Sequence, residues 1–308
     1  LFRSQFRSNM PKIIVVGSSN TDMVIQSARI PRPGETILGG TFFMNPGGKG
    51  ANQAVAATRL GGEVHFICKV GKDVFGDMAL SQFAEEGMHT EFVQQDSNLA
   101  SGVALINVDS HGENSITVAS GANAALKTAD IDQAEGLFCS GDVLLIQLET
   151  PLETVWYAIK KAHEKGLKVI LNPAPAAEIP EDVYPYIYAL TPNETETELL
   201  TGVQVDSLAK AHEAAQILLN KGLQNLIITM GSQGAYFQSA DTKLFIPAQS
   251  VEAVDTTAAG DCFNGALAVA ISQGKDWESG IRFACEAATR SVTRMGAQAS
   301  MPYLTDLA

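Results

Sequence analysis

Residues 143–171 read VLLIQLETPLETVWYAIKKAHEKGLKVIL. This stretch holds a short apolar run at 143–146, a helical segment over 152–165 that Gly166 closes, and a second apolar run at 167–171. Glycine just after the last helical residue is a common C-terminal signal. A strand, a helix and a strand in this order predict two parallel strands joined by a crossover helix.

The same alternation continues on both sides of this stretch. Ile13-Ile-Val-Val16 is a short apolar run that Gly17 ends. Further strands are predicted at 187–190 and 226–229, with a helix over 208–221 between them. Alternating strands and helices predict an α/β fold, with a doubly wound, mainly parallel sheet flanked by helices.

Two stretches break the alternation, because no covering helix follows either of them. Met23 to Asn45 carries turn residues without a helical period, and Ser101 to Ser120 contains two strand patterns. We expect the segments of about 23–46 and 100–121 to pair into a small second sheet, inserted into a single domain of residues 10–308. A small sheet beside an α/β core indicates a lid over a binding site. The alternative is an extension of the main sheet.

The composition excludes several classes of protein. The chain has 308 residues and a net charge of −13, without the basic patch that binds nucleic acid or an anionic membrane. It also lacks an apolar run of the roughly 18 residues that cross a bilayer. The four cysteines are scattered, which fits free thiols in a reducing cytoplasm. Residues 1–9 precede Met10, and we expect them to be vector-derived.

One motif joins a small-residue turn to a carboxylate. Asp255-Thr-Thr-Ala-Ala-Gly-Asp261 follows a strand-like run at 251–254 and opens a helix over 262–271. The first amides of a helix are unpaired and form an anion site that suits phosphate. Asp261 could accept a proton from an attacking hydroxyl, and the alternative is that it only caps the helix. Because a helix N-terminus stabilises an ionised carboxylate, we expect a depressed pKa for Asp261.

Two motifs near the N-terminus suit a sugar. In Asn45-Pro-Gly-Gly-Lys-Gly-Ala-Asn52 the glycines clear space, Lys49 and Asn52 add donors, and the P-loop spacing is absent. Asn20-Thr21-Asp22 combines an amide with a carboxylate, which together donate to and accept from vicinal hydroxyls. The alternatives are a glycine turn before a helix and a turn that Asn and Asp stabilise through their own backbone.

Two later motifs suit a nucleotide and its metal ion. In Thr191-Pro-Asn-Glu-Thr-Glu-Thr-Glu198, Asn193 and one glutamate could hold Mg²⁺, and the alternative is a solvated acidic helix start. Thr229-Met-Gly-Ser-Gln-Gly234 could seat the phosphates or ribose of a nucleotide. It could equally be a hairpin turn into residues 235–237.

Together these motifs resemble the ribokinase branch of the ribokinase/phosphofructokinase-B family of sugar kinases, over Met10 to Leu304. The segments that carry the resemblance are Gly17-Ser-Ser-Asn-Thr-Asp22, Gly47-Gly-Lys-Gly-Ala-Asn-Gln53, Gln147-Leu-Glu-Thr-Pro151, Asn172-Pro-Ala-Pro-Ala176, Thr191-Pro-Asn-Glu-Thr-Glu196, Asp255-Thr-Thr-Ala-Ala-Gly-Asp261 and Gly296-Ala-Gln298. The resemblance implies a ribokinase-like fold with a β-lid. It also implies ATP-dependent phosphorylation of D-ribose at its 5-hydroxyl, which gives ribose 5-phosphate.

The resemblance further implies a role for individual residues. Those that would hold the sugar are Asn20, Thr21, Asp22, Gly48, Lys49, Asn52 and Glu149. Asp261 would be the base, and the anion hole would use the amides of Ala258, Ala259 and Gly260. The nucleotide site would comprise Asn193, Thr229, Gly231, Ser232, Gln233, Gly234, Gly260 and Cys285. Glu196 would act on Mg²⁺ through water. An activating K⁺ would be held, partly through carbonyl groups, by Asp255, Thr257, Ser291, Arg294, Gly296 and Ser300. The lids of two chains would join in a homodimer.

One residue departs from the family pattern, and other functions stay open. Cys285 stands where His or Asn often flanks the adenine, and a thiol packs there as a small apolar group. The alternatives are another kinase of the family, acting on fructose, deoxyribose or a nucleoside, and a non-catalytic sugar-binding paralogue. A Rossmann dehydrogenase is disfavoured because Gly17-Ser-Ser-Asn20 lacks the Gly-x-Gly-x-x-Gly spacing.

Overall fold

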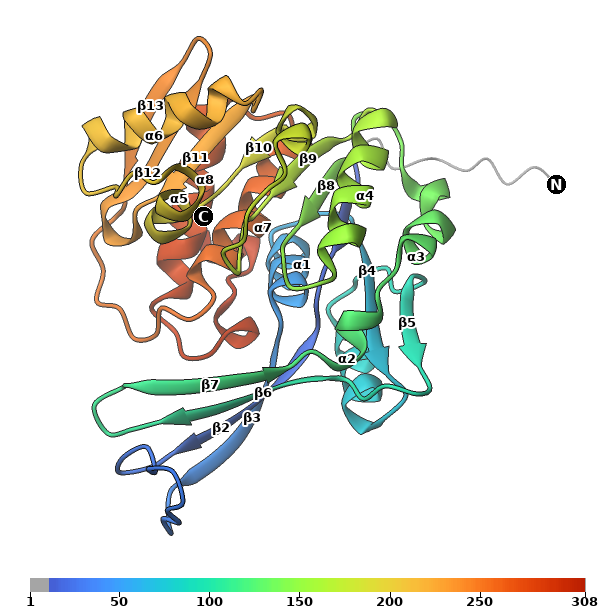
Figure 1. The fold of residues 1–308 in the computed structure, drawn as a ribbon, viewed down its shortest axis with the longest axis vertical. Coiled ribbons are helices and arrows are strands. Elements are labelled where there is room, and N and C mark those ends of the chain that lie inside the picture. The colour runs from blue at the N-terminus through green and yellow to red at the C-terminus, as the bar shows by residue number, and fades with distance from the viewer. Residues whose placement is uncertain (1–10, 308) are drawn as a thin grey trace, which may run out of the picture.

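Nine strands form the main sheet, in the order β13-β12-β11-β10-β9-β8-β1-β4-β5 (Figure 1). The computed structural model describes residues 11–307, so the expectations for residues 1–9 and Met10 lie outside it. The strands of this sheet are β1 Ile13–Val16, β4 Val64–Gly71, β5 Val93–Asp96, β8 Val143–Ile146, β9 Lys168–Leu171, β10 Ala189–Leu190, β11 Asn225–Thr229, β12 Gly234–Ser239 and β13 Lys243–Pro247. Neighbours from β11 to β5 are parallel, and β12 is antiparallel to β11 and β13.

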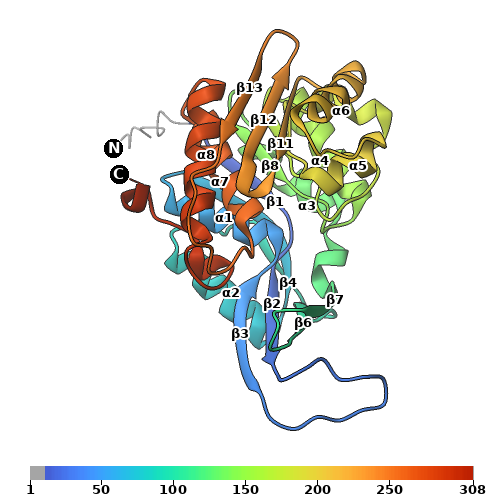
Figure 2. The same cartoon turned by 90° about the vertical axis from the view of Figure 1, so that its left-hand side faces the viewer.

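Helices cover both faces of this sheet, as the sequence predicts for a doubly wound fold (Figure 2). One layer consists of α1 Lys49–Arg59, α2 Val74–Glu85, α7 Ala259–Ser272 and α8 Trp277–Ser291. The other consists of α3 Thr128–Gln133, α4 Leu152–Glu164, α5 Glu194–Thr201 and α6 Leu208–Asn220. Among the described residues, the helices are all too short or too polar to span a bilayer.

The division of the core follows from strand alternation. Successive residues of β1 point to opposite faces of the sheet. Ile13 and Val15 therefore belong to the core cluster that includes residues of α1 and α7, while Ile14 and Val16 belong to the cluster that includes residues of α4 and α6. Because all four are fully buried, β1 is apolar throughout, as central parallel strands are.

Most of the predicted elements are present, and one is wrong. The strand–helix–strand prediction over 143–171 is confirmed, with boundaries that differ by one residue. The run at 251–254 is not a strand. Its residues are exposed, and the Val254 amide donates to the Val292 carbonyl instead of a strand neighbour. Two valines in a short stretch resemble a strand in sequence, but no strand of the described residues pairs with them.

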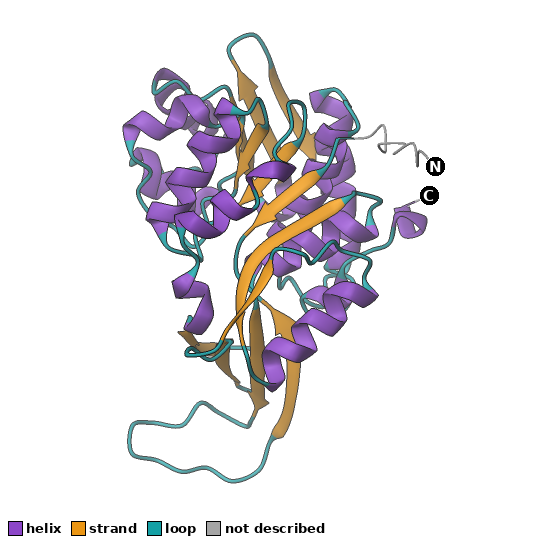
Figure 3. Cartoon of the chain, turned by 90° about the vertical axis from the view of Figure 1, so that its right-hand side faces the viewer, coloured by secondary structure: helices purple, strands orange, loops and turns teal. Residues whose placement is uncertain are grey.

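A second sheet of four strands stands apart from the main one (Figures 1 and 3). Its strands, in the order β3-β2-β6-β7, are β2 Asn20–Gln26, β3 Thr41–Gly47, β6 Gly102–Val108 and β7 Asn114–Ala119. A long loop joins β2 to β3 and extends beyond the strands (Figure 3). The base of β2 follows β1 directly, and β3 runs into α1, so this sheet grows out of the carboxyl end of β1.

Candidate active site

Helix α7 begins at Ala259 and carries the Asp261 carboxylate in its first turn. No side chain caps this helix, and Ala258, the residue before it, has a φ of 60°. Over the described range of 11–307, Ala258 is the one non-glycine residue with a positive φ. A left-handed alanine costs roughly 1–2 kcal/mol, and such strain gathers at functional sites. The left-handed conformation of Ala258 therefore leads the chain into an uncapped helix start, at a cost in conformational energy.

The surroundings of Gly260, the second residue of α7, are open. A Cβ built on Gly260 meets no atom within 4 Å, and Gly260 is exposed. Of the three amides predicted to form the anion hole, that of Ala259 also donates to the Thr256 carbonyl, at 3.3 Å. Because first-turn amides have no partner inside their helix, Gly260 presents its N–H to the open side.

Asp261 lies at the centre of a buried polar cluster. It is only 6% exposed, and its two carboxylate oxygens accept hydrogen bonds from Asn52 Nδ2 and Gln53 Nε2, each at 2.9 Å. Burial raises the pKa of Asp261, although Lys49 and the two amides act in the opposite direction. The expected depression of this pKa is therefore wrong in sign. Removal of the carboxylate from water outweighs the opposing effects of Lys49, Asn52 and Gln53.

Three amide side chains without a predicted role form a hydrogen-bonded chain that ends on the Asp261 carboxylate. Gln53 also donates to Asn172 Oδ1 at 2.9 Å, and it accepts from Gln147 Nε2 at 2.7 Å. These residues come from α1 and from the ends of β9 and β8. Their burial and these hydrogen bonds fix the position of Gln53 and, through it, of Asp261. The signal in the sequence was the position of Gln53, which directly follows the predicted Asn52.

Asn20 and Asp22 lie on β2, where the second sheet leaves the body of the protein. Asp22 fits tightly against Gly47, because a Cβ at Gly47 would lie within 2.5 Å of the Asp22 carboxylate. Asn20 Oδ1 accepts from Asn123 Nδ2 at 2.8 Å. Strand alternation turns the Thr21 side chain to the opposite face of the sheet from those of Asn20 and Asp22.

Glu149 is held by the start of α1. Its Oε2 accepts from the Lys49 amide at 2.9 Å and from Ser18 Oγ at 2.5 Å. Gly48, the N-cap of α1, has a φ of 89°, and a Cβ there would lie 2.8 Å from the Asn20 amide. This glycine is therefore required both by its conformation and by the close approach of β2.

The Lys49 ammonium interacts electrostatically with three carboxylates, which are predicted to bind the sugar, to act as the base and to act on the metal ion. Burial opposes its charge, but Asp261, Glu149 and Glu196 raise its pKa overall, so it stays protonated among three carboxylates. Beside it, Asn52 Oδ1 is buried without a hydrogen-bond partner among the described residues. A buried acceptor of this kind costs roughly 1–3 kcal/mol unless a ligand donates to it. A sugar hydroxyl would supply that donor.

Asn193 and Glu196 form a capping box at the start of α5. Asn193 Oδ1 accepts from the Glu196 amide at 2.8 Å, and Glu196 Oε2 accepts from the Asn193 amide at 2.9 Å. Glu196 is 8% exposed, and burial raises its pKa. The other two glutamates of the motif, Glu194 and Glu198, are not buried. Glu196 therefore does belong to a helix start, as the alternative predicted, but it is buried rather than solvated. The capping box engages only its Oε2, so Oε1 can make other contacts.

The predicted nucleotide loop is a hairpin turn beside this capping box. Thr229 pairs with Asn193 in a parallel bridge, and residues 231–234 turn β11 into the antiparallel β12. Gly231, Ser232 and Gln233 are exposed, so the turn can still contact a ligand. Cys285 is buried in the core on α8, and burial raises the pKa of its thiol to about 11.

The predicted cation loop is tied together by Asp255. Its two carboxylate oxygens accept from the Thr257 amide at 2.9 Å and the Gly296 amide at 2.8 Å. The Asp255 amide donates to Val292, which follows Ser291. Ser300 Oγ donates to a nearby carbonyl group, and Arg294 pairs with Asp306 at 3.1 Å. The structure thus joins the two chain segments that carry this set.

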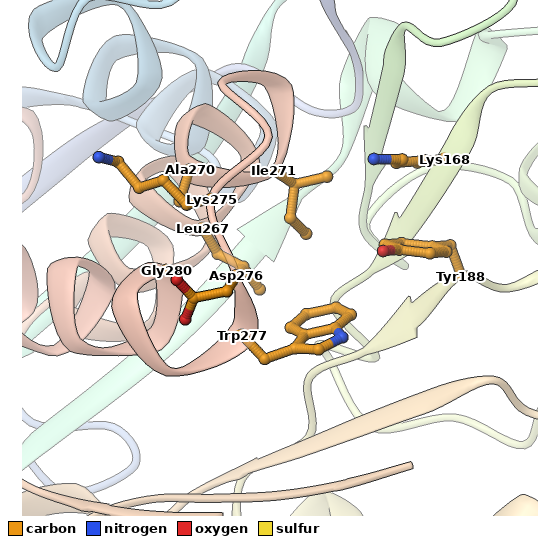
Figure 4. Close-up of a pocket in the computed structure, with 9 residues that line it drawn as sticks. All are labelled: Lys168, Tyr188, Leu267, Ala270, Ile271, Lys275, Asp276, Trp277 and Gly280. Carbon is orange, nitrogen blue, oxygen red and sulfur yellow. The ribbon is translucent and has the colours of Figure 1, made fainter. Parts of the chain in front are cut away.

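A separate cavity of about 140 Å³ lies at the other end of α7 (Figure 4). Lys168, Tyr188 and Trp277 line it, together with Ala270 and Ile271 near the C-terminus of α7. A helix rises 1.5 Å per residue, so this cavity is about 15 Å from the Asp261 end. None of the predicted site residues lines it. The chemistry-bearing residues instead meet at the carboxyl ends of β1, β8, β9, β10 and β11, where α/β sheets bind ligands.

Comparison with known proteins shows which family this chain belongs to. Residues 10–304 match the model of the pfkB family carbohydrate kinases. The chain is 43% identical to the ribokinase of Haemophilus influenzae over 290 residues, which cover 94% of this chain and 95% of that protein. It is 40% identical to the deoxyribokinase of Salmonella typhimurium over 291 residues, with 94% and 95% covered. The structure of Arabidopsis thaliana ribokinase complexed with ribose and ATP has a TM-score of 0.89, with 31% identity and 97% of each chain covered. The chain therefore belongs to the pfkB family of carbohydrate kinases.

Proposed function

We propose that this protein transfers the terminal phosphoryl group of ATP to the 5-hydroxyl of D-ribose. The observation that carries the proposal is the position of a buried carboxylate, Asp261, in the first turn of a helix whose start is uncapped and exposed at Gly260. Phosphoryl transfer depends mainly on positioning and on charge stabilisation. Asp261 would receive the proton of the 5-hydroxyl, while the Gly260 amide and Lys49 would stabilise the transferred group.

The sugar would lie between β2 and α1. The side chains that would contact it there are those of Asn20, Asp22, Lys49, Asn52 and Glu149. Asn52 Oδ1, which has no partner among the described residues, would accept a hydrogen bond from a sugar hydroxyl. Similarity to a ribokinase bound to ribose and ATP supports this placement. The second candidate is deoxyribose, because a deoxyribokinase is similar at 40% identity.

An ATP-coupled turnover assay separates these candidates. Ribose, deoxyribose, fructose, adenosine and xylulose would each be tested as the acceptor with the full chain. We expect the largest kcat/KM for ribose. A larger value for deoxyribose would assign the protein to that substrate, and turnover of none of them would contradict the proposal.

Mg²⁺ would enter with ATP and neutralise charge on its phosphates. Glu196 fits a role beside it, because its carboxylate is buried near Lys49 and Asp261 and only one of its oxygens is engaged by the capping box. Asn193, Thr229 and the turn at 231–234 would contact the nucleotide. Cys285 would offer the adenine an apolar surface, because its thiol is protonated.

Activation by a monovalent cation, K⁺, is expected at the loop that Asp255 ties together. Both Asp255 oxygens are engaged by amides, so this side chain would brace the loop while carbonyl groups face the cation. The loop leads directly into Ala258 and the α7 start. We therefore expect replacement of K⁺ by tetramethylammonium to lower kcat for ribose. Equal turnover in the two salts at matched ionic strength would contradict this expectation.

Ribose use should depend on the ionisation of Asp22. Burial and the charge of Glu149 raise the pKa of Asp22 from its ordinary 3.8 to about 6. Only the ionised carboxylate accepts two hydroxyl donors, so kcat/KM for ribose should fall as the pH drops through about 6. The same shift favours folding when Asp22 is protonated. That contribution is complete below pH 3.8 and is lost as the pH rises through about 6.

The variant Asp22→Asn isolates this effect. We expect it to raise KM for ribose and to flatten the change in the free energy of unfolding between pH 3.8 and 6. Denaturant unfolding and steady-state kinetics at several pH values provide the two measurements. The Asp22 assignment fails if the wild-type and variant proteins show the same pH profile in both.

The second sheet would serve as the lid and as the contact between two chains. Apolar side chains exposed on this sheet are Ile25, Phe42, Met44, Leu105, Ile116 and Val118. Exposed apolar groups gathered on one small sheet are typical of an interaction surface.

All four cysteines are free thiols, which supports a reducing, cytoplasmic setting for the protein.

Charged substitutions on the two faces of this sheet test the dimer. Leu105 pairs with Thr117 and Ile116 pairs with Ile106, so Leu105 and Ile116 point to opposite faces. By light scattering after size exclusion, the wild-type chain should be a dimer, and either Leu105→Asp or Ile116→Asp should be a monomer. If the wild type is a monomer, or if both variants remain dimers, the second sheet does not form a contact between two chains.

A further inference from the structure

Two histidines and a glutamate gather at the amino end of β4, away from the groups that surround Asp261. Glu63 immediately precedes β4, His65 is its second residue, and His89 lies in the segment between α2 and β5. The site described above uses the carboxyl ends of the strands. This cluster therefore belongs to the opposite end of the sheet, ahead of the stretch in which β4 and β5 pair through Cys68–Gly71 and Val93–Asp96 (Figure 1).

The backbone brings the two histidines together. His65 and His89 form a parallel bridge, in which the Phe66 amide donates to the His89 carbonyl at 3.1 Å and the His89 amide donates to the Val64 carbonyl at 2.9 Å. Residues paired in this way point to the same face of a sheet. Their imidazole rings stack with centroids 4.2 Å apart and planes 8° apart.

His65 lacks the hydrogen bonds that a buried imidazole normally makes. It is 7% exposed, and neither Nδ1 nor Nε2 has a hydrogen-bond partner among the described residues. The nearest carboxylate oxygen is Glu63 Oε1, which lies 3.7 Å from Nε2 and beyond hydrogen-bond distance. Buried polar atoms without partners call for an explanation, such as a bound ion.

The cluster has the donor set of a metal site. Glu63, His65 and His89 each offer one ligand atom, and these three atoms lie within 4.8 Å of one another. Two imidazole nitrogens and a carboxylate oxygen are a common ligand set for zinc, with water in the open position. Glu63 and His89 are partly exposed, which gives an ion a path from solvent. Glu91 Oε1 lies 3.4 Å from His89 Nδ1, in the place of a carboxylate that orients a ligating ring.

We propose that Glu63, His65 and His89 bind a divalent transition-metal ion of the Zn²⁺ class. The stacked rings must open for both nitrogens to point at one ion. His65 is fixed by burial, so the exposed His89 ring turns about its side-chain bonds. The ion then ties the start of β4 to the segment that enters β5. It acts on stability and not on the chemistry at Asp261.

Calorimetric titration of the full chain with Zn²⁺, without nucleotide, tests this proposal. One equivalent should bind, and His89→Ala or Glu63→Gln should weaken the affinity at least about tenfold. Loss of an outer partner already costs that much. Both side chains are partly exposed, so the variants should fold. Because neither residue belongs to the proposed ribose site, kcat for ribose should stay unchanged in both.

The matched control is His111→Ala, which removes an exposed histidine from the β6–β7 turn and should bind Zn²⁺ like the wild type. Zn²⁺ should also raise the Tm of the wild type and of His111→Ala, but not that of His89→Ala at the same concentration. The proposal is overturned if Zn²⁺ does not bind saturably, or if His89→Ala and Glu63→Gln bind it as tightly as the wild type.

Discussion

Replacing Asp261 by asparagine is expected to lower kcat for ribose by about 10²- to 10⁴-fold, the range in which a positioned general base contributes. Asparagine keeps the size of the side chain but cannot take the hydroxyl proton. The affinity for ribose should change little, because Asn20, Asp22 and Glu149 remain. Steady-state kinetics give kcat, and calorimetric titration with ribose gives the binding constant separately.

The variant should remain folded, for a reason that the structure supplies. The raised pKa of Asp261 means that its charge opposes folding at neutral pH, so removal of the charge is favourable. Against this, one of the donors on Asn52 and Gln53 would face the new amide group, at a cost of roughly 1–3 kcal/mol. The two effects oppose each other, and denaturant unfolding measures the balance.

Asp276→Asn is the matched control for a carboxylate at a helix start. Asp276 caps α8 by accepting from the Ser279 amide at 2.9 Å, and asparagine caps a helix equally well. We expect its kcat to equal that of the wild type. If Asp261→Asn reduced kcat by less than about tenfold, the role of Asp261 would be structural and the reaction would need another base.

Gly260→Ala should have opposite effects on stability and on activity. Gly260 lies in the first turn of α7 without a positive φ, and a Cβ there would meet no protein atom within 4 Å. The fold therefore does not require glycine at this position. Alanine favours helices over glycine by up to about 1 kcal/mol, so the free energy of unfolding should stay the same or rise.

Activity should nevertheless fall, because the added methyl group occupies the space in front of the helix amides. Loss of one donor to a developing negative charge costs about 10²- to 10³-fold in kcat, and we expect an effect of this size. Gly136→Ala is the control, since a Cβ at Gly136 is equally unobstructed and lies outside the site. A fully active Gly260→Ala variant would place the transferred phosphoryl group elsewhere.

The sequence predicted the elements that carry the site and the motifs within them. Periodic apolar runs and terminal glycines are local signals, so the strand and helix over 143–171 could be located within one residue. The run at 251–254 failed because a strand needs a neighbour, and two valines do not reveal whether one exists. The family resemblance placed Asp261 and Lys49 in roles that their spacing alone left open.

Only the tertiary structure decided the state of the groups inside the site. Gln53 and Asp261 are 208 residues apart in the chain, and no local pattern reveals that they share a hydrogen bond. A position at a helix start predicts a lowered pKa for Asp261, while the fold buries the carboxylate, and burial is the largest influence on its pKa and raises it. Likewise, alternation along β2 separates Thr21 from Asp22, although the two are adjacent in the motif. Local conformation follows from neighbouring residues, whereas burial, charge and pairing depend on what long-range packing brings into contact.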